Sequence, residues 1–251
     1  NNRCWRRFLR WWKDMNEHKF DQKGGIYSKA RPSYPDRLFS YLTGNGYIGK
    51  ATVIADIGSG TGKFTQQIGR YSEKVFAVEP NDDMRLIAEK NFSDCRNIIS
   101  VNGSAENTTL SDSSVDFITV AQAYHWFDRD WCDHGKWPQI YWWYSELILE
   151  NYDINRRFCP NFKGPSNGID FSKEAFADFF EGDFIVVEFG NDLIYDENTF
   201  VSRCLSSSYA PNQGDENYNP YVNELRELFE KYSKNSVVPY PYITRCYIGN
   251  V

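Results

Sequence analysis

Short apolar runs alternate along the chain with amphipathic segments of helical periodicity, a pattern typical of a parallel sheet whose buried strands are joined by helices. The runs predict strands at 53–57, 75–78, 98–102 and directly after Asp116. The other segments predict helices at 63–71, at 83–91 and around Leu38, Phe39 and Leu42. This order of elements predicts an α/β fold built from βαβ units.

The turn after the first of these runs carries three alternating glycines, Gly58, Gly60 and Gly62. Glycine suits such a turn because the backbone can take unusual angles there and approach a ligand without a Cβ in the way. The next run ends at Glu79, seventeen residues after the last glycine. A carboxylate about 20 residues beyond a glycine turn is where a βαβ unit brings an acid to a ribose diol. The pattern predicts a site for a nucleoside cofactor.

The position of the third glycine distinguishes between turns that bind two different classes of cofactor. A dinucleotide-binding turn would have a glycine at position 63, which is Lys63, so a nicotinamide-dependent oxidoreductase is the weaker alternative. The carboxylate of Asp56, two residues before the first glycine, suits a ligand with positive sulfonium and ammonium groups better than a pyrophosphate. Asp56-x-Gly58-x-Gly60-x-Gly62 is similar to the first motif of class I S-adenosylmethionine-dependent methyltransferases.

Two further segments resemble the type 11 branch of that family, which acts on small molecules. They run from Tyr27 through Arg31 to Pro35, and from Ala121 to Phe127. The resemblance implies that Tyr27 lies near the methionine end of the cofactor and that Arg31 is available for its carboxylate. Ser104 stands where the family usually has an acid for the adenine amino group. The expected cofactor-binding residues are Tyr27, Arg31, Asp56, Gly58, Ser59, Gly60, Gly62, Glu79, Pro80, Met84, Ser104, Ala105, Glu106, Ala121 and Gln122.

The same resemblance places residues 121–127 beside the transferable methyl group, because ligands of open α/β sheets lie beyond the carboxyl ends of the strands. His125 is the candidate catalytic residue, since an imidazole can take a proton from an attacking oxygen or nitrogen. A second interpretation is that His125 only orients the loop or binds the cofactor. Trp126, Arg203 and Tyr209 are candidate substrate contacts, although Arg203 and Tyr209 could instead anchor the lid to which they belong.

The expected architecture is a Rossmann-like, seven-stranded, mostly parallel sheet with an antiparallel last strand, helices on both faces and a helical lid at about 196–236. One methyltransferase domain is expected over 19–251, preceded by a basic amphipathic helix or extension at 1–18. The later strands are expected at 139–144, 184–189 and 242–248, and the later helices at 145–152, 172–180 and 221–232. The sequence departs from the family over 129–144, through either a real shortening or a gap or misassignment in the sequence.

The charge and cysteine content of the chain restrict the classes of partner that we expect it to bind. The net charge of −6 argues against a nucleic acid partner bound through its phosphates, so a small-molecule methyl acceptor is expected. The six cysteines form no CxxC pair, which favours reduced thiols in the cytoplasm, and no metal site is suggested. No apolar run approaches the ~18 residues of a membrane span. The aromatic and basic residues at 3–15 would pack on the body of the protein or, less favoured, touch a membrane surface.

These observations predict an S-adenosylmethionine-dependent methyltransferase that transfers a methyl group to a small acceptor by direct displacement. The alternative is an S-adenosylmethionine-binding regulatory or interaction protein without turnover, suggested by Ser104 and by the irregular segment after Asp128. The sequence does not indicate the acceptor, the atom methylated or the oligomeric state.

Overall fold

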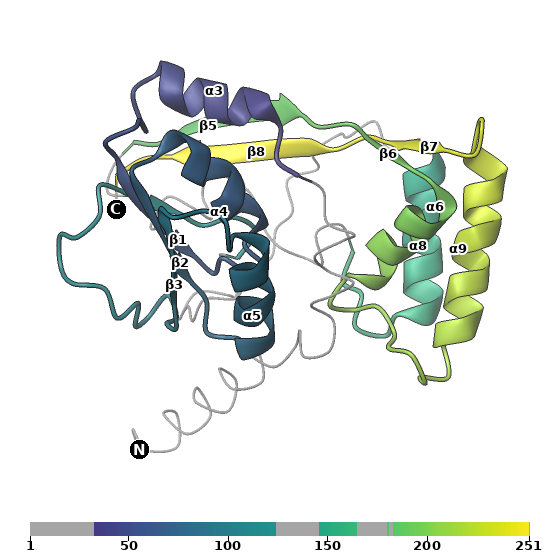
Figure 1. The fold of residues 1–251 in the computed structure, drawn as a ribbon. Helices are drawn as coiled ribbons and strands as arrows, with labels where there is room; N and C mark the ends of the chain where they lie inside the picture. The colour runs from purple at the N-terminus through teal and green to yellow at the C-terminus, as the bar shows by residue number, and fades with distance from the viewer. Residues whose placement is uncertain (1–32, 124–145, 165–179, 181–182, 251) are drawn as a thin grey trace. The chain divides into compact units, whose positions relative to one another are not determined.

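A computed structural model describes residues 33–123, 146–164, 180 and 183–250 (Figure 1). These residues form two compact units. The parallel-sheet unit comprises 36–123, and the helical unit comprises 33–35 and the described residues from 146 onward. Several expectations lie outside the described residues: the helix at 3–15, the strand at 139–144 with the irregular segment 129–144, and most of the helix at 172–180.

The parallel-sheet unit contains four strands in the order β3-β2-β1-β4, and all neighbouring pairs are parallel. The strands are β1 (Val53–Ile57), β2 (Lys74–Val78), β3 (Ile98–Val101) and β4 (Phe117–Thr119). The helices are α3 (Asp36–Gly44), α4 (Lys63–Ile68) and α5 (Asp82–Asn91). The predicted α/β fold is confirmed for these four parallel strands, and the seven-stranded sheet stays a prediction.

Branched apolar side chains fill the interior of this unit. Ile54, Val75 and Val78 have no exposed surface, as expected of strands covered on both faces. The helix predicted at 63–71 is shorter: α4 ends at Ile68, and a 3-10 turn occupies Gly69–Tyr71. At the start of α5, the Asn81 side chain accepts a hydrogen bond from the Met84 N–H at 2.9 Å, the usual way to satisfy a free helix-end donor.

The helical unit is built from three helices and two antiparallel strand pairs. The helices are α6 (Glu146–Phe158), α8 (Glu197–Leu205) and α9 (Tyr218–Tyr232). β5 (Ile185–Gly190) pairs with β8 (Ile243–Ile248), and β6 (Leu193–Tyr195) pairs with β7 (Val238–Tyr240). The strands expected at 184–189 and 242–248 are therefore present and antiparallel to each other. The sequence did not predict β6 and β7.

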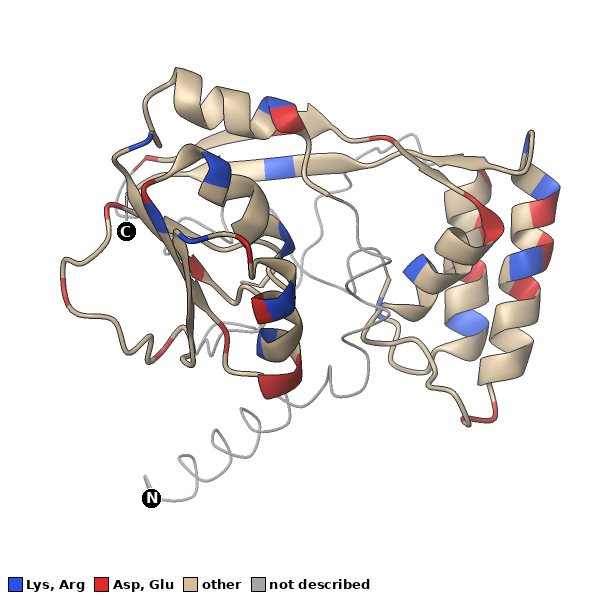
Figure 2. Ribbon diagram, viewed as in Figure 1, with Lys and Arg blue, Asp and Glu red and all other residues tan. Residues whose placement is uncertain are grey.

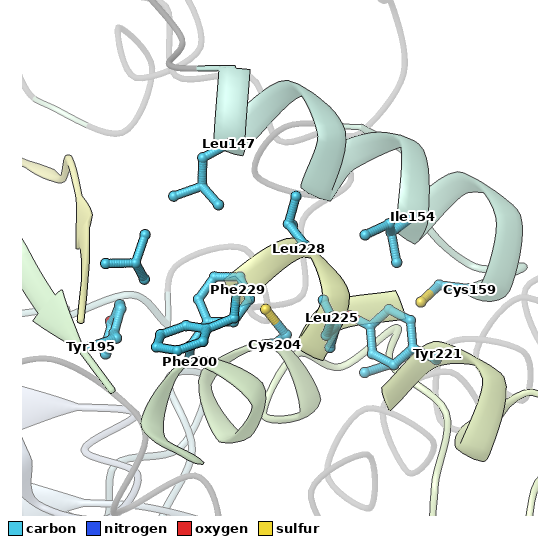
Figure 3. Packing of buried hydrophobic residues seen from close by; sticks show 12 residues of the cluster. Leu147, Ile154, Cys159, Tyr195, Phe200, Cys204, Tyr221, Leu225, Leu228 and Phe229 are labelled. Atoms are coloured by element: carbon cyan, nitrogen blue, oxygen red, sulfur yellow. The ribbon is translucent and has the colours of Figure 1, made fainter. Parts of the chain in front are cut away.

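One hydrophobic cluster holds the three helices together (Figure 3). Phe200 from α8 and Tyr221 and Leu225 from α9 have no exposed surface, and Leu147 and Ile154 of α6 pack against the same cluster. Charged residues of both signs occur along α9 (Figure 2). Among the described residues, no helix is long and apolar enough to cross a membrane.

Candidate functional site

The candidate cofactor site lies at the carboxyl edge of the parallel sheet, where four loops follow the four strands. The register places Ile57 beside Val78, and Val78 beside Val101. It also places Asp56 beside Thr119 on β4. Since all four strands run in one direction, the segments that begin at 58, 79, 102 and 120 leave the sheet at the same edge. The predicted motifs occupy these four segments.

The glycine turn is fixed to the end of the neighbouring strand. The N–H groups of Gly58 and Ser59 both donate to the Val78 carbonyl, at 2.9 and 3.1 Å. Gly58, Gly60 and Gly62 have φ angles of 69°, 57° and 75°, in the left-handed region that costs other residues about 1–2 kcal/mol. The alternating glycines are therefore required by the backbone conformation itself.

Gly60 and Gly62 differ in their surroundings. A Cβ added at Gly60 would meet no atom within 4 Å, so the turn has an open side at this residue. A Cβ at Gly62 would lie 2.9 Å from two carbons of the Phe92 ring and 3.2 Å from the Ala88 Cβ. Gly62 thus allows the start of α4 to pack closely against α5, whereas Gly60 leaves room at the turn.

Glu79 connects the glycine turn to the loop after β2. Its Oε2 accepts the Gly60 N–H at 2.8 Å, and its Oε1 accepts the Asn81 N–H at 2.9 Å. The side chain is largely buried, so the carboxylate is held in one place before any ligand arrives. A carboxylate has two oxygens that act only as acceptors, which suits a pair of ribose hydroxyls.

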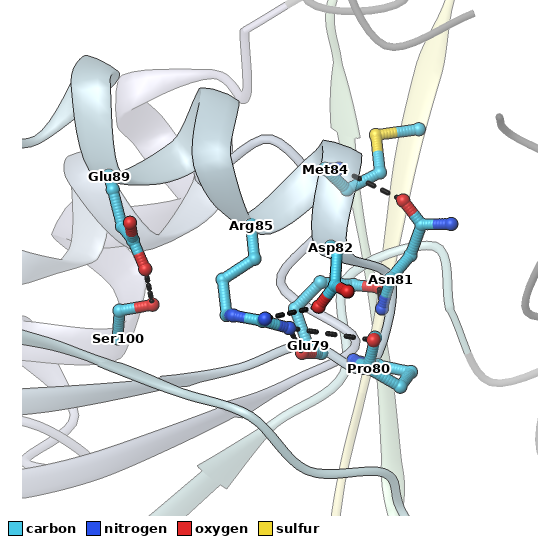
Figure 4. A network of polar contacts seen from close by, with 8 residues as sticks. All are labelled: Glu79, Pro80, Asn81, Asp82, Met84, Arg85, Glu89 and Ser100. Atoms are coloured by element: carbon cyan, nitrogen blue, oxygen red, sulfur yellow. Dashed lines mark hydrogen bonds and ion pairs between the residues drawn. The ribbon is translucent and has the colours of Figure 1, made fainter. Parts of the chain in front are cut away.

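Arg85 holds the backbone behind this carboxylate (Figure 4). Its Nη1 donates to the Glu79 carbonyl at 3.1 Å, and its Nη2 pairs with the Asp82 carboxylate. The predicted residue Pro80 lies in the same loop, and Met84 is buried in the first turn of α5. The sequence analysis did not identify Arg85. Its only signal in the sequence is an arginine in the first turn of the helix that follows Glu79.

Asp56 is fully buried beneath the site and has no exposed surface. Its Oδ2 accepts the Thr65 hydroxyl at 2.6 Å and its Oδ1 accepts the Thr119 hydroxyl at 2.8 Å, which connects β1 to α4 and β4. Burial raises the pKa of Asp56 to about 6, with a smaller contribution from the charge of Glu79, while the two hydroxyls oppose the increase. The carboxylate acts here as a cross-link, and direct contact with a ligand stays a prediction.

The loop after β3 places a carboxylate beside Ser104. Ser104 and Asn107 exchange two backbone hydrogen bonds of 3.0 and 3.2 Å, and the Ser104 Oγ donates to Glu106 Oε2 at 2.7 Å. A carboxylate therefore adjoins the position of the missing acid. Ala105 packs on the apolar cluster of β1 and β2. After β4, Ala121 is half-buried, and Gln122 is exposed with a φ of 59°.

The other predicted residues are not among the described residues of this unit. Tyr27, Arg31, His125 and Trp126 are outside the described residues. Arg203 and Tyr209 belong to the helical unit: Arg203 on α8 donates to the Tyr242 hydroxyl, and Tyr209 packs edge-on against Phe162 with the ring centroids 4.9 Å apart.

The described residues fit a nucleoside cofactor at this edge. The Ser59 Oγ, in the glycine turn, is buried without a hydrogen-bond partner among the protein atoms, and a buried polar atom of this kind normally has one. The open side of Gly60 and the fixed carboxylate of Glu79 adjoin it along the turn. Among the described residues, no group of histidine, cysteine, aspartate and glutamate side chains could hold a metal ion.

Comparisons with known proteins agree with this geometry. Residues 55–132 match the family model Methyltransf_11, described as a methyltransferase domain. An uncharacterized methyltransferase-like protein of Schizosaccharomyces pombe is 36% identical over 107 residues, 41% of this chain and 40% of the relative. A candidate methyltransferase of Dictyostelium discoideum is 39% identical over 137 residues, 53% of this chain and 47% of the relative. The chain thus spans less than half the length of these curated relatives.

A solved structure has a similar fold. A candidate type II methyltransferase from Anaeromyxobacter dehalogenans superposes with a TM-score of 0.56 at 19% identity, covering 88% of this chain and 97% of the other. The family resemblance drawn from the sequence is confirmed by these matches.

Proposed function

Residues 55–132 carry a methyltransferase domain of the type 11 family, and from this premise we propose that the chain binds S-adenosylmethionine and transfers its methyl group to a small molecule. The observation that carries the proposal is the contact of Glu79 with the Gly60 N–H at 2.8 Å. It joins the acid after β2 to the open side of the glycine turn. A fixed acceptor beside a turn free of side chains is the arrangement that a nucleoside needs.

In this proposal the carboxylate of Glu79 accepts the ribose hydroxyls, and the turn from Gly58 to Gly60 admits the ribose and the methionine portion. Ser104 and Glu106, which already share a hydrogen bond, accept from the adenine amino group. When bound, S-adenosylmethionine supplies a methyl group made electrophilic by the positive sulfonium. Arg85 acts indirectly, because it holds the Glu79 backbone.

The acceptor half of the reaction is proposed from the sequence. Direct displacement requires an attacking atom in line with the methyl group, and alignment alone supplies much of the rate. His125 and Trp126 are proposed to border the methyl group, and Arg203 and Tyr209 to contact the acceptor. His125 serves either as a base or as an orienting group.

Two finer statements are also part of the proposal. The antiparallel pairing of β8 with β5 supports the antiparallel last strand of a seven-stranded sheet. The four cysteines in the described ranges, Cys95, Cys159, Cys204 and Cys246, are free thiols, which supports a reducing, cytoplasmic location.

Calorimetric titration with S-adenosylmethionine tests the cofactor site. We expect Glu79→Ala to weaken binding at least tenfold, on the order of 1.4 kcal/mol, because the ribose loses its fixed acceptor. Glu89→Ala is the matched control: Glu89 lies on α5, carries the same charge and contacts the exposed Ser100 hydroxyl. Equal affinities for the folded variants would remove Glu79 from the site.

Turnover requires a second assay. The protein is incubated with methyl-labelled S-adenosylmethionine and a panel of small metabolites, and label is followed into products. We expect transfer to one chemical class. Tight binding of S-adenosylmethionine without transfer to any member would favour the regulatory or interaction protein instead.

A further inference from the structure

Arg203 is the one arginine without a counter-ion in the described part of the helical unit. Every other arginine there forms an ion pair with a carboxylate: Arg156 with Asp153, Arg157 with Glu224, Arg226 with Glu197 and Arg245 with Glu188. Arg203 instead donates from Nη2 to the Tyr242 hydroxyl and lies over the Tyr242 ring, with Cζ 5.6 Å from the centroid. Its positive charge therefore meets only neutral groups.

The unused donor of Arg203 is also its most enclosed atom. The side chain as a whole keeps partial exposure, but Nε is buried and has no hydrogen-bond partner. A guanidinium is always charged and offers five donors in a rigid fork. Burying such a donor unpaired is unfavourable, so a ligand that supplies both an acceptor and a negative charge would bind favourably here.

Three tyrosine side chains lie close enough to this arginine for its charge to act on their hydroxyls. The Tyr195 hydroxyl is likewise buried without a hydrogen bond of good geometry, and Arg203 is the hydrogen-bonding group close to it. Burial raises the pKa of Tyr195 to about 12, and burial also raises the pKa of Tyr209 and Tyr240, while the charge of Arg203 acts in the opposite direction on all three. These hydroxyls are thus protonated donors close to one cation, a combination suited to a carboxylate.

We propose that Arg203, together with the Tyr195 hydroxyl, binds a carboxylate group of the methyl acceptor, which makes small carboxylic acids the substrate class. This inference rests on the proposed function for the identity of the acceptor. Arg203 has no ion pair with a carboxylate among the described residues, so a carboxylate of the ligand would not have to displace one.

The test uses succinate as the probe and its neutral diamide, succinamide, as the matched ligand. Calorimetry is performed on the full chain in the presence of S-adenosylmethionine. Succinate should bind and succinamide should not, because only succinate carries carboxylates. Arg203→Gln should weaken succinate binding at least tenfold, while Arg226→Gln, which removes the same charge from an exposed position on α9, should leave it unchanged.

Tyr195→Phe is a second variant that distinguishes a loss of ligand binding from a loss of folding. It removes only a hydroxyl without a hydrogen bond of good geometry in the protein, so a purely structural Tyr195 predicts an unchanged or higher melting temperature and unchanged binding. The proposal predicts an unchanged or higher melting temperature with weaker succinate binding. Unweakened binding in Tyr195→Phe removes that hydroxyl from the site and overturns the pairing proposed.

Titration with S-adenosylmethionine distinguishes a failure of the carboxylate site from a failure of the proposed methyltransferase function. If S-adenosylmethionine binds but neither succinate nor the tricarboxylate citrate does, the carboxylate site is wrong and the methyltransferase proposal stands. If carboxylates bind with the expected dependence on Arg203 and S-adenosylmethionine does not bind, the anion site stands and the proposed function fails. Equal binding of succinate to Arg203→Gln and to the unaltered chain overturns the inference.

Discussion

Replacing Asp56 by asparagine should change how the stability of the protein depends on pH. Burial raises the pKa of this carboxyl from its ordinary 3.8 to about 6. Below about pH 4 the side chain is protonated in both the folded and the unfolded chain. Between about pH 4 and 6 the unfolded chain loses this proton while the folded chain keeps it, so the free energy of unfolding falls as the pH rises. Above about pH 6 the contribution is constant.

The magnitude follows from the two pKa values. A rise from 3.8 to about 6 is a difference of roughly two units, and each unit corresponds to about 1.4 kcal/mol, so ionising Asp56 costs the folded state about 3 kcal/mol at neutral pH. Asparagine is neutral at every pH and close in shape to the protonated acid. Part of this cost is already present at pH 4, so the difference in unfolding free energy between the unaltered protein and Asp56→Asn should shift by about 2.4 kcal/mol against the unaltered protein between pH 4 and pH 7.

Urea unfolding followed by circular dichroism, at pH 4 and at pH 7, measures this shift. Asp83→Asn is the control, because Asp83 is exposed on α5 and its replacement removes the same charge. The control measures how much of any change comes from removing a negative charge alone. If the Asp56→Asn difference is the same at both, the folded carboxyl titrates normally and the account of its burial is wrong.

Four further substitutions test the site and the hydrophobic interior. Gly62→Ala should destabilise the protein by roughly 2–5 kcal/mol, because a clash with the phenylalanine ring at 2.9 Å adds to the strain of a positive φ. In Gly60→Ala the added Cβ meets no atom within 4 Å, so urea unfolding should show a loss of only about 1–2 kcal/mol. Because Gly60 lies on the open side of the turn, this variant should weaken S-adenosylmethionine binding more than Gly62→Ala does. Arg85→Gln should weaken that binding about fivefold in calorimetry, since one hydrogen bond to the Glu79 carbonyl is lost; unchanged affinity would remove its positioning role. Tyr221→Phe leaves a buried asparagine oxygen without its 2.8 Å donor, and thermal unfolding should show a loss of about 1–3 kcal/mol.

The sheet and the glycine turn were predictable because both depend on local sequence. A buried parallel strand is a short apolar run, and β1 and β2 appear where those runs predict them. The positive φ of Gly58 and Gly60 corresponds to glycines placed where other residues would be strained. The spacing to Glu79 gave the position of the acid, but not its hydrogen bond to Gly60.

Other features depend on contacts that the sequence does not show. Nothing local predicts that Thr65 and Thr119, from different elements, would occupy both oxygens of Asp56. The pair β6 and β7 is also difficult to predict, because each strand has only three residues and β7 contains Pro239, which usually argues against a strand.

The lack of a counter-ion at Arg203 among the described residues could not be predicted from the sequence either. The sequence identified it as a candidate substrate contact from its place in the insertion, without information on its counter-ion. Only the structure shows that the neighbouring arginines of the helical unit are paired and this one is not. The roles of Arg203 and Tyr209 toward a substrate stay predictions that the binding experiments address.

Each unit has hydrophobic clusters of its own among the described residues, and this bears on how substitutions combine. In these ranges the cluster around Tyr221 has its buried members at 147–238, and the clusters around Ala55 and Ala88 lie at 55–120. Substitutions that share no contacts usually act independently on stability. Changes inside the cluster around Tyr221 and changes beneath the glycine turn should therefore add in their effects on the free energy of unfolding.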